Sequence, residues 1–139
     1  MIRPMSLDEM RALLEQGRVG RLGCVSEGKP YIVPVSYILS GDAIYIHSLV
    51  GRKVRALRHD PRACLQVDDI QDAYNWRSAI AFGRYEEIAD AGEREQAVRR
   101  LLARFPHLTP VESVPVHDGQ SSVIVFRIRV EEMTGVCEA

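Results

Sequence analysis

Hydrophobic positions in the first part of the chain recur with the period of an α-helix. Over residues 6–16 they fall three or four positions apart, so they share one helix face. These positions are Leu7, Met10, Leu13 and Leu14. Ser6 and Glu9 have the spacing of a capping box, in which each side chain satisfies a free backbone amide of the other. We therefore predict a first helix over residues 6–16 that stops at Gly17.

The pattern then changes to short β-rich runs at residues 22–26, 31–39 and 43–48. Turn-forming residues separate the runs, at 27–30 and 40–42. Such short connections favour an antiparallel meander of three strands. Pro34 lies inside the second run and cannot donate to a strand ladder, so we expect a sheet edge or a bulge there.

The second half predicts two more helices and further strands. Residues 51–59 form a short amphipathic helix that ends before Pro61, and residues 93–105 form a longer one with Ala97, Leu101 and Leu102 facing inward. Strands are expected at 63–67, 74–88 and 122–130, the last one after a loop that contains Pro110, Pro115 and Gly119. Strands joined by short turns, with peripheral helices, favour a small antiparallel barrel in a single domain over residues 1–139.

Composition limits the function classes. The 139 residues carry a net charge of −1, from 18 Lys and Arg against 19 Asp and Glu, so no whole-molecule field attracts nucleic acid. Cys24, Cys64 and Cys137 lack C-x-x-C spacing and are expected as buried thiols. We see no apolar leader and no run of about 20 apolar residues that could cross a bilayer, and we therefore expect a cytoplasmic protein without membrane contact.

One segment is strongly basic. Five cations within eleven positions are opposed only by Asp60; they are Arg52, Lys53, Arg55, Arg58 and Arg62. The last three are expected to form a solvated cationic face. Arg52 and Lys53 fall in the first helical turn, where free amides and the helix dipole favour an anion and a cation is unfavourable for the helix alone. With His47 and Ser48 just before the turn, this arrangement predicts a phosphate site.

A second polar cluster comes at residues 74–78. By strand alternation Trp76 and Ser78 share one face and Arg77 points to the other. Trp76 is also explained as a core or interface anchor, and Arg77 as a surface cation. Phosphate-binding loops of the G-x-G-x-x-G and G-x-x-x-x-G-K-[ST] types are not found.

Several segments together resemble a known family. They are "GRLGCVSEGKPYIVPVSYIL", "AIYIHSLVGRKVRALRHDPRACLQVDD", "YNWRSAIAFGRYEEI" and "VEEMTG". Their order and spacing resemble the flavin-binding split barrels related to pyridoxamine 5'-phosphate oxidase, within them the nitroimidazole-resistance-like branch. The resemblance implies a mainly β fold, a six-stranded antiparallel split β-barrel with N-terminal, crossover and C-terminal-half helices. It also implies a homodimer with two FMN sites between the subunits.

The resemblance also assigns roles to individual residues. It places one strand segment along the isoalloxazine, mainly through backbone groups: Pro34, Val35, Ser36 and Tyr37. It brings His47 and Ser48 to the ribityl-phosphate side, in place of the family's arginine-containing phosphate strand. Lys53 would bind the phosphate with Arg52 beside it, and Arg77 and Ser78 would add phosphate or ribityl contacts. The C-terminal substrate-binding residues of true pyridoxamine-phosphate oxidases are not found, which argues against vitamin B6 oxidation.

These features predict an FMN-dependent oxidoreductase that reduces a small electron-poor compound, with nitroaromatic compounds as candidates and NADH or NADPH as a possible electron donor. No catalytic acid or nucleophile is recognised, and hydride transfer would not require one. Two alternatives stay open within the superfamily. One is a deazaflavin-dependent reductase; the other is a flavin- or haem-binding protein without turnover, with His47, His107 or His117 as a candidate axial ligand.

Two further classes are disfavoured. Nucleic-acid binding would rest on one short basic helix without interleaved aromatic residues. A metal site would have to use scattered histidines, or Asp68 and Asp69, which point to opposite faces of a strand.

Overall fold

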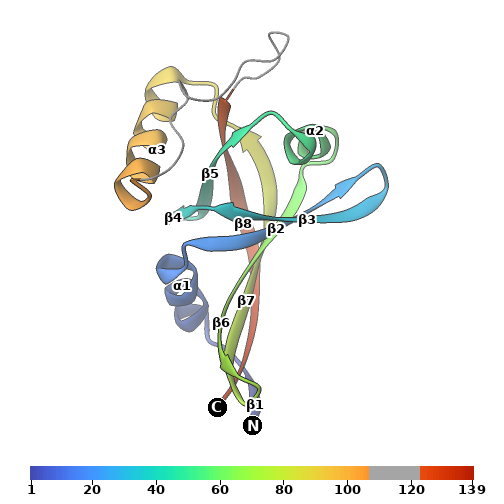
Figure 1. Ribbon diagram of the computed structural model, residues 1–139, viewed down its shortest axis with the longest axis vertical. Coiled ribbons are helices and arrows are strands. Elements are labelled where there is room, and N and C mark those ends of the chain that lie inside the picture. Colours follow the sequence, from blue (N-terminus) through green and yellow to red (C-terminus); the bar gives the residue numbers. More distant parts are fainter. Residues whose placement is uncertain (107–122) are drawn as a thin grey trace.

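The computed structural model describes residues 1–106 and 123–139, which form eight strands and three helices (Figure 1). The helices are α1 (Leu7–Gln16), α2 (Arg52–His59) and α3 (Ala91–Arg104). The strands are β1 (Ile2–Pro4), β2 (Val19–Ser26), β3 (Lys29–Ser36), β4 (Ile38–Ser40), β5 (Ala43–Leu49), β6 (Arg62–Asp72), β7 (Asn75–Glu87) and β8 (Val123–Glu138).

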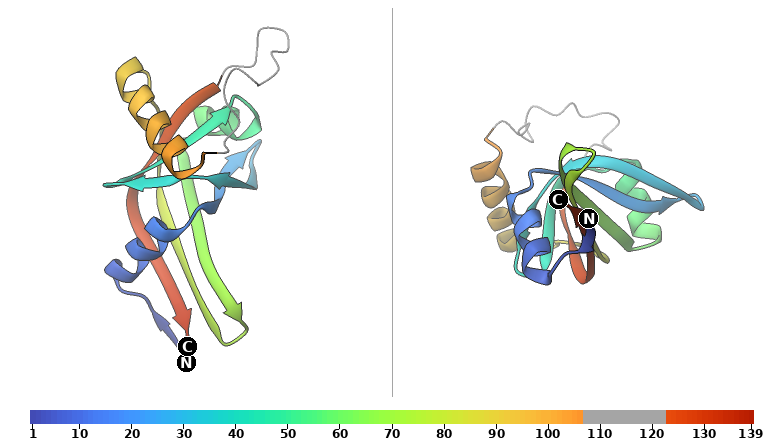
Figure 2. Two further views of the ribbon diagram at one scale, coloured as in Figure 1. Left: turned by 60° about the vertical axis from the view of Figure 1, so that its left-hand side comes forward. Right: turned by 90° about the horizontal axis from the view of Figure 1, so that it is seen from below.

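All of these strands belong to one antiparallel sheet with the order β3-β2-β6-β7-β8-β5-β4, and β1 pairs with β8. The long strands β6, β7 and β8 run down the centre of the molecule to the end where the two termini lie (Figure 1). The sheet is strongly curved, as the views in Figure 2 show, so that its inner face encloses a core. The fold is therefore mainly β with peripheral helices, as predicted.

The number and length of the strands differ from the expectation. The resemblance implies six strands, whereas β1 and β4 raise the number to eight because each adds a three-residue strand. β8 continues to Glu138 rather than stopping near Val130, and β6 continues to Asp72. These extensions read Asp-Asp-Ile-Gln-Asp in β6 and Glu-Glu-Met-Thr-Gly-Val-Cys-Glu in β8, without regular apolar alternation, so hydrophobic periodicity does not report the strand.

The expected three-strand meander is wrong. The run at residues 31–39 is interrupted at Tyr37, which separates β3 at one edge of the sheet from β4 at the other. β3 pairs with β2 alone, and β5 pairs with β4 and β8. The chain passes from one edge of the sheet to the other at this point instead of turning back on itself, and the Tyr37 side chain is completely buried there. The prediction of an edge at Pro34 is confirmed because β3 is the edge strand.

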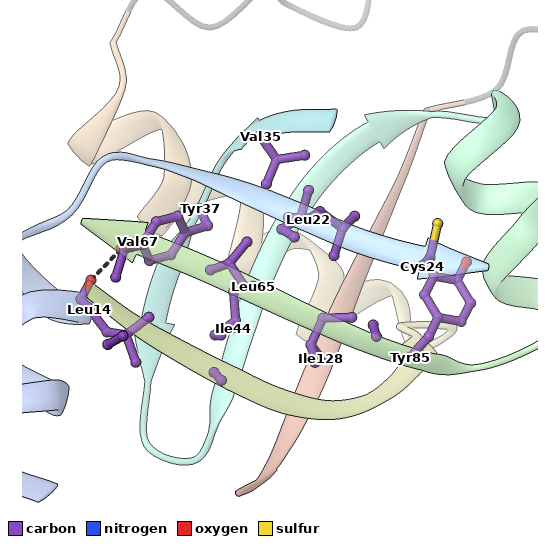
Figure 3. Close-up of a cluster of buried hydrophobic side chains, with 14 of the residues drawn as sticks. Leu14, Leu22, Cys24, Val35, Tyr37, Ile44, Leu65, Val67, Tyr85 and Ile128 are labelled. Atoms are coloured by element: carbon purple, nitrogen blue, oxygen red, sulfur yellow. Dashed lines mark hydrogen bonds between the residues drawn. The ribbon is translucent and has the colours of Figure 1, made fainter. Parts of the chain in front are cut away.

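The core fills the space inside the curved sheet (Figure 3). Its fully buried side chains include Leu14, Leu22, Tyr37, Ile44, Leu57, Leu65, Phe126 and Ile128. The three predicted helices are confirmed to within two residues at each end, and α1 has the predicted capping box between Ser6 and Glu9. Leu102, however, is 40% exposed and does not face inward, whereas Ala97 and Leu101 are buried.

The junction of β7 and β8 contains a register shift between Phe82 and Gly83. A Cβ atom at Gly83 would lie 2.1 Å from the carbonyl oxygen of Arg129, so only glycine lets the two strands approach at this level. Cys24 and Cys137 are buried free thiols as expected, while Cys64 is partly exposed. Within residues 1–106 and 123–139, no helix is long and apolar enough to cross a membrane.

Candidate functional site

The first turn of α2 leaves several backbone amides without partners. The helix begins after Gly51, which makes no side-chain capping bond, and its first turn holds no acidic residue. The amides of Arg52, Lys53 and Val54 have no partner within the helix because the first intrahelical donor is Arg55, which bonds to the Gly51 carbonyl. Free amides at the positive end of the helix dipole favour a negatively charged group.

Arg52 is held in a fixed position beside this turn. Its Nε donates to the Oγ of buried Ser26 at 3.0 Å, and its guanidinium carbon lies 4.5 Å from the centre of the Tyr31 ring. These two contacts use one nitrogen and the planar face of the group. The two terminal nitrogens have no hydrogen-bond partner among the described residues and stay available as donors.

Lys53 is a half-buried cation. Burial lowers the pKa of its amine, since desolvation disfavours the charged form. No carboxylate of the described residues lies within 4 Å of this amine. A partly desolvated ammonium group at the positive end of a helix is unfavourable for the protein alone, and an anionic ligand would remove that penalty.

The other cations of the basic segment are bound to carboxylates. Arg58 pairs with Glu87, and Arg62 pairs with Asp60 at 2.7 Å; both arginines are exposed. Lys53, Arg52 and Arg55 have no such partner in the described part of the chain. The structure therefore divides the segment into two neutralised cations and three that remain available to a ligand.

His47 and Ser48 are not brought together. They are neighbours on β5, so their side chains project to opposite faces of the sheet. Ser48 is buried on the inner face with Ile46, and its Oγ donates to the Leu49 carbonyl at 2.8 Å. His47 lies on the other face with Tyr45, and burial lowers the pKa of its imidazole. The two side chains cannot both contact one phosphate.

The segment from Pro34 to Tyr37 can offer little besides its backbone. Pro34 is exposed on the outer face of edge strand β3, Val35 is buried and Ser36 is half-buried. The Tyr37 hydroxyl donates to the Leu14 carbonyl at 2.6 Å inside the core, which commits this side chain to the fold. The outer edge of β3 carries backbone groups that pair with no strand of the described residues.

Arg77 and Ser78 lie on opposite faces of β7, as alternation predicts. Arg77 pairs with Asp69 at 2.9 Å, and the Ser78 Oγ accepts a bond from the Gln66 Nε2 at 3.1 Å. Strand register places Ser78 opposite Asp68. The pairing of β6 with β2 places Asp68 level with the start of β2. Ser26, at the other end of β2, is about seven residues away, or roughly 23 Å. One copy of the chain does not bring Arg77 and Ser78 to Lys53.

An open groove of about 730 Å³ lies on the outer face of β2, β3, β6 and β7, between these two regions. Its walls include Gly23, Tyr31, Ile32, Cys64, Gln66, Ile80 and Phe82. Sequence reasoning did not find this groove. A signal was present, because the run 79–82 of β7 is apolar at every position, and both faces of such a strand tend to be covered.

The arrangement matches a known family. The pyridoxamine 5'-phosphate oxidase family profile matches residues 6–136 of the chain. The chain belongs to this family. An uncharacterized member from Rhizobium meliloti (strain 1021) is 32% identical over 141 residues, which cover 96% of this chain and 93% of that protein.

Solved structures of similar proteins have the same split-barrel fold. A FAD-binding protein of Mesorhizobium loti is 28% identical, with a TM-score of 0.81 over 100% of this chain and 99% of that chain. A provisionally named 5-nitroimidazole antibiotic resistance protein of Bacteroides thetaiotaomicron is 21% identical, with a TM-score of 0.77 over 99% of this chain and 87% of that chain. The expected membership of the split-barrel oxidase-like family is confirmed.

Two expected features fall partly outside the described residues. His107 and His117, named as candidate haem ligands, lie in the segment that the structure does not describe, as do Pro110, Pro115 and Gly119 of the expected loop. Within the described ranges, no group of three or more His, Cys, Asp or Glu side chains could hold a metal ion.

Proposed function

We propose that this protein binds a flavin, as FMN, and acts as a flavin-dependent oxidoreductase on a small electron-poor compound. The observation that carries the proposal is Lys53, a half-buried ammonium group with a lowered pKa and no carboxylate within 4 Å in the described residues. It stands beside the free amides of the first turn of α2. Family membership supports a flavin as the source of the anion.

The phosphate would bind between Lys53, Arg52 and the amides of the first turn. Two charged donors and several amides suit the three oxygens of a phosphate monoester. At an effective dielectric constant of 20, unit charges about 4 Å apart gain about 4 kcal/mol. That gain exceeds the roughly 0.3–1 kcal/mol that a cation costs at a helix N-terminus.

The ring system would lie along the outer-face groove. A cavity of about 730 Å³ is large enough for a tricyclic ring, and its walls combine apolar side chains with the polar or charged Arg21, Arg62, Gln66 and Asp68. The unpaired edge of β3 adds backbone donors and acceptors. When bound, a flavin supplies hydride and electron transfer, and the chain's own task is to anchor, orient and shield it.

A second copy of the chain would complete the site. Arg77 and Ser78 lie roughly 23 Å along the sheet from the phosphate position, so their expected flavin contacts require a partner subunit. Ile32 and Phe82 are 68% and 39% exposed on the groove face, where a homodimer would cover them. The proposal therefore includes a homodimer with shared flavin sites.

The substrate class rests on the sequence resemblance to the nitroimidazole-resistance-like branch. Nitroaromatic compounds are the first candidates, with NADH or NADPH as electron donor. None of the described residues is assigned as a catalytic acid or nucleophile, and the open groove leaves room for a flat substrate over the ring.

The test uses the two lysines of the chain, Lys53 and Lys29. Purified protein is expected to show flavin absorbance or to take up FMN from solution with quenching of flavin fluorescence. Lys53→Ala is expected to weaken FMN binding by about 10-fold or more, while Lys29→Ala, which removes an exposed lysine from β3, keeps the affinity. No flavin uptake by the wild type, or equal affinity in both variants, would overturn the assignment; a Soret band after haem addition would point to the haem alternative.

A further inference from the structure

A second pocket of about 470 Å³ lies against another face of α2. It is formed between this helix and the turn that joins β2 to β3, and its polar lining residues are Ser26, Glu27, Arg52, Arg55 and His59. Figure 1 shows the helix beside that hairpin. Arg55 and His59 follow Arg52 by three and seven positions, so these three residues form one stripe along α2. Lys53 is turned about 100° away from Arg52 around the helix.

The pocket is cationic. Arg52 and Arg55 are exposed, and neither has a carboxylate within 4 Å in the described part of the chain. His59 adds an imidazole. Glu27 is the one carboxylate among the lining residues and offsets a single positive charge. Arg58, on the same helix, does not line the pocket, and its charge is neutralised by an ion pair with Glu87.

The position of Arg52 is suited to a phosphate. Its Nε donates to Ser26 and the planar face of its guanidinium lies over the Tyr31 ring, so the guanidinium is held in place with its two terminal nitrogens free to donate. Little side-chain entropy remains to be lost when these nitrogens bind phosphate oxygens, and with two of them Arg52 can donate to each of two adjacent phosphates. Arg55 lies one turn further along the same stripe and can contact the same group.

We propose that this pocket binds a second phosphate, which is linked to the first one in a diphosphate group. A dinucleotide would then span the first turn of α2, with one phosphate on the Lys53 side and the other between Arg52 and Arg55. The inference rests on the proposed function for the first phosphate alone. FAD and a pyridine dinucleotide share the required diphosphate, and the two sources are separated by the experiment.

The experiment compares FMN, FAD, ADP and NADPH on the full chain. Arg55→Ala is expected to weaken FAD or ADP binding by about 10-fold, the value of one charge-assisted hydrogen bond, and to leave FMN affinity unchanged. His59→Ala tests the other end of the stripe, and Arg55→Lys is expected to restore part of the loss. Arg58→Ala is the matched control, because it removes an arginine of the same helix that lies outside the pocket.

The source follows from the ligand affected. A wild-type preference for FAD over FMN that Arg55→Ala abolishes assigns the pocket to the flavin's own diphosphate. ADP or NADPH binding to the FMN-loaded protein that depends on Arg55 assigns it to a pyridine dinucleotide. If Arg55→Ala changes the affinity of none of these four ligands, or changes FMN as much as FAD, the second phosphate site is wrong.

The same measurements separate this inference from the proposed function. FMN binding that depends on Lys53 but not on Arg55, without any dinucleotide effect, leaves the flavin proposal intact and removes the second site. ADP binding that depends on Arg55 in a protein that takes up no flavin has the opposite meaning. Melting curves of each variant confirm that a lost affinity is not a lost fold.

Discussion

The hydroxyl of Tyr37 donates a hydrogen bond to the backbone carbonyl of Leu14 across 2.6 Å in the interior of the protein. Figure 3 shows this bond between the residue that separates β3 from β4 and the C-terminal part of α1. The Leu14 carbonyl lies in the last turn of its helix, where carbonyls have no helical partner. The bond therefore satisfies this carbonyl and ties the end of α1 to the point where the chain passes from β3 to β4.

Removing this hydroxyl is expected to destabilise the protein. Tyr37→Phe leaves the Leu14 carbonyl without its partner in a buried place, which costs about 1–3 kcal/mol in the free energy of unfolding. Urea denaturation of both proteins measures the difference. An unchanged midpoint would show that water or another group satisfies the carbonyl.

Gly17 provides a test of the same contact by steric means. A Cβ atom at this position would lie 2.2 Å from the Tyr37 hydroxyl oxygen, while the next carbon of the ring is 3.4 Å away. Gly17→Ala is therefore expected to cost more than 1 kcal/mol in the wild type and much less in the Tyr37→Phe background. Additive effects in this double-mutant cycle would contradict the predicted clash.

Lys53 is expected to reduce stability in the absence of a ligand. Lys53→Met removes a desolvated cation at a helix N-terminus, so the flavin-free protein should gain roughly 0.5–1 kcal/mol while it loses flavin binding. Burial places the folded-state pKa of Lys53 below its ordinary value of 10.5. The gain should therefore shrink as the pH rises through that lowered pKa toward 10.5, because the wild-type amine is then neutral in the folded state.

Denaturation of both proteins at neutral and alkaline pH measures this change. Lys29→Met is the control, because Lys29 is exposed and should give no gain at either pH. A less stable Lys53→Met protein at neutral pH would show that the amine has a stabilising partner.

His47 is expected to make stability sensitive to mild acid. Burial lowers the pKa of its imidazole below 6.5 in the folded protein. The unfolded chain then binds a proton more readily, so stability falls as the pH drops from above 6.5 through the lowered folded-state pKa. The melting temperature of His47→Gln should fall less between about pH 7.5 and 5 than that of the wild type, and an equal fall in both proteins would contradict the prediction.

The outer-face groove is expected to be covered by a second subunit. Phe82→Glu introduces a charge in its apolar wall and should convert a dimer into monomers, with weaker flavin binding because Arg77 and Ser78 are lost from the shared site. Leu102→Glu is a matched control, since Leu102 on α3 is 40% exposed and Phe82 is 39% exposed. Light scattering after gel filtration measures the mass, and a monomeric wild type would contradict the proposed dimer.

Some of the site could be predicted from sequence. The start of α2 follows from Gly51 and the apolar spacing of Val54 and Leu57, so Arg52 and Lys53 were correctly placed in its first turn. The opposite faces of Arg77 and Ser78 followed from strand alternation. Alternation also applied to His47 and Ser48, which were nevertheless expected to act together, and the structure separates them.

The sequence by itself determined the helices and most of the strands, because these depend on residues that are close together along the chain, and it indicated the family through the order and spacing of several segments. Only the tertiary structure decided which cations of the basic segment are paired with a carboxylate and which are not. Arg58 finds Glu87, which lies 29 residues away, while Lys53 finds no carboxylate in the described residues. It also decided that the Tyr37 hydroxyl bonds to the carbonyl of Leu14, 23 residues before it. Counterions and buried hydrogen-bond partners come from distant segments, and no local pattern of residues reports which of them will meet.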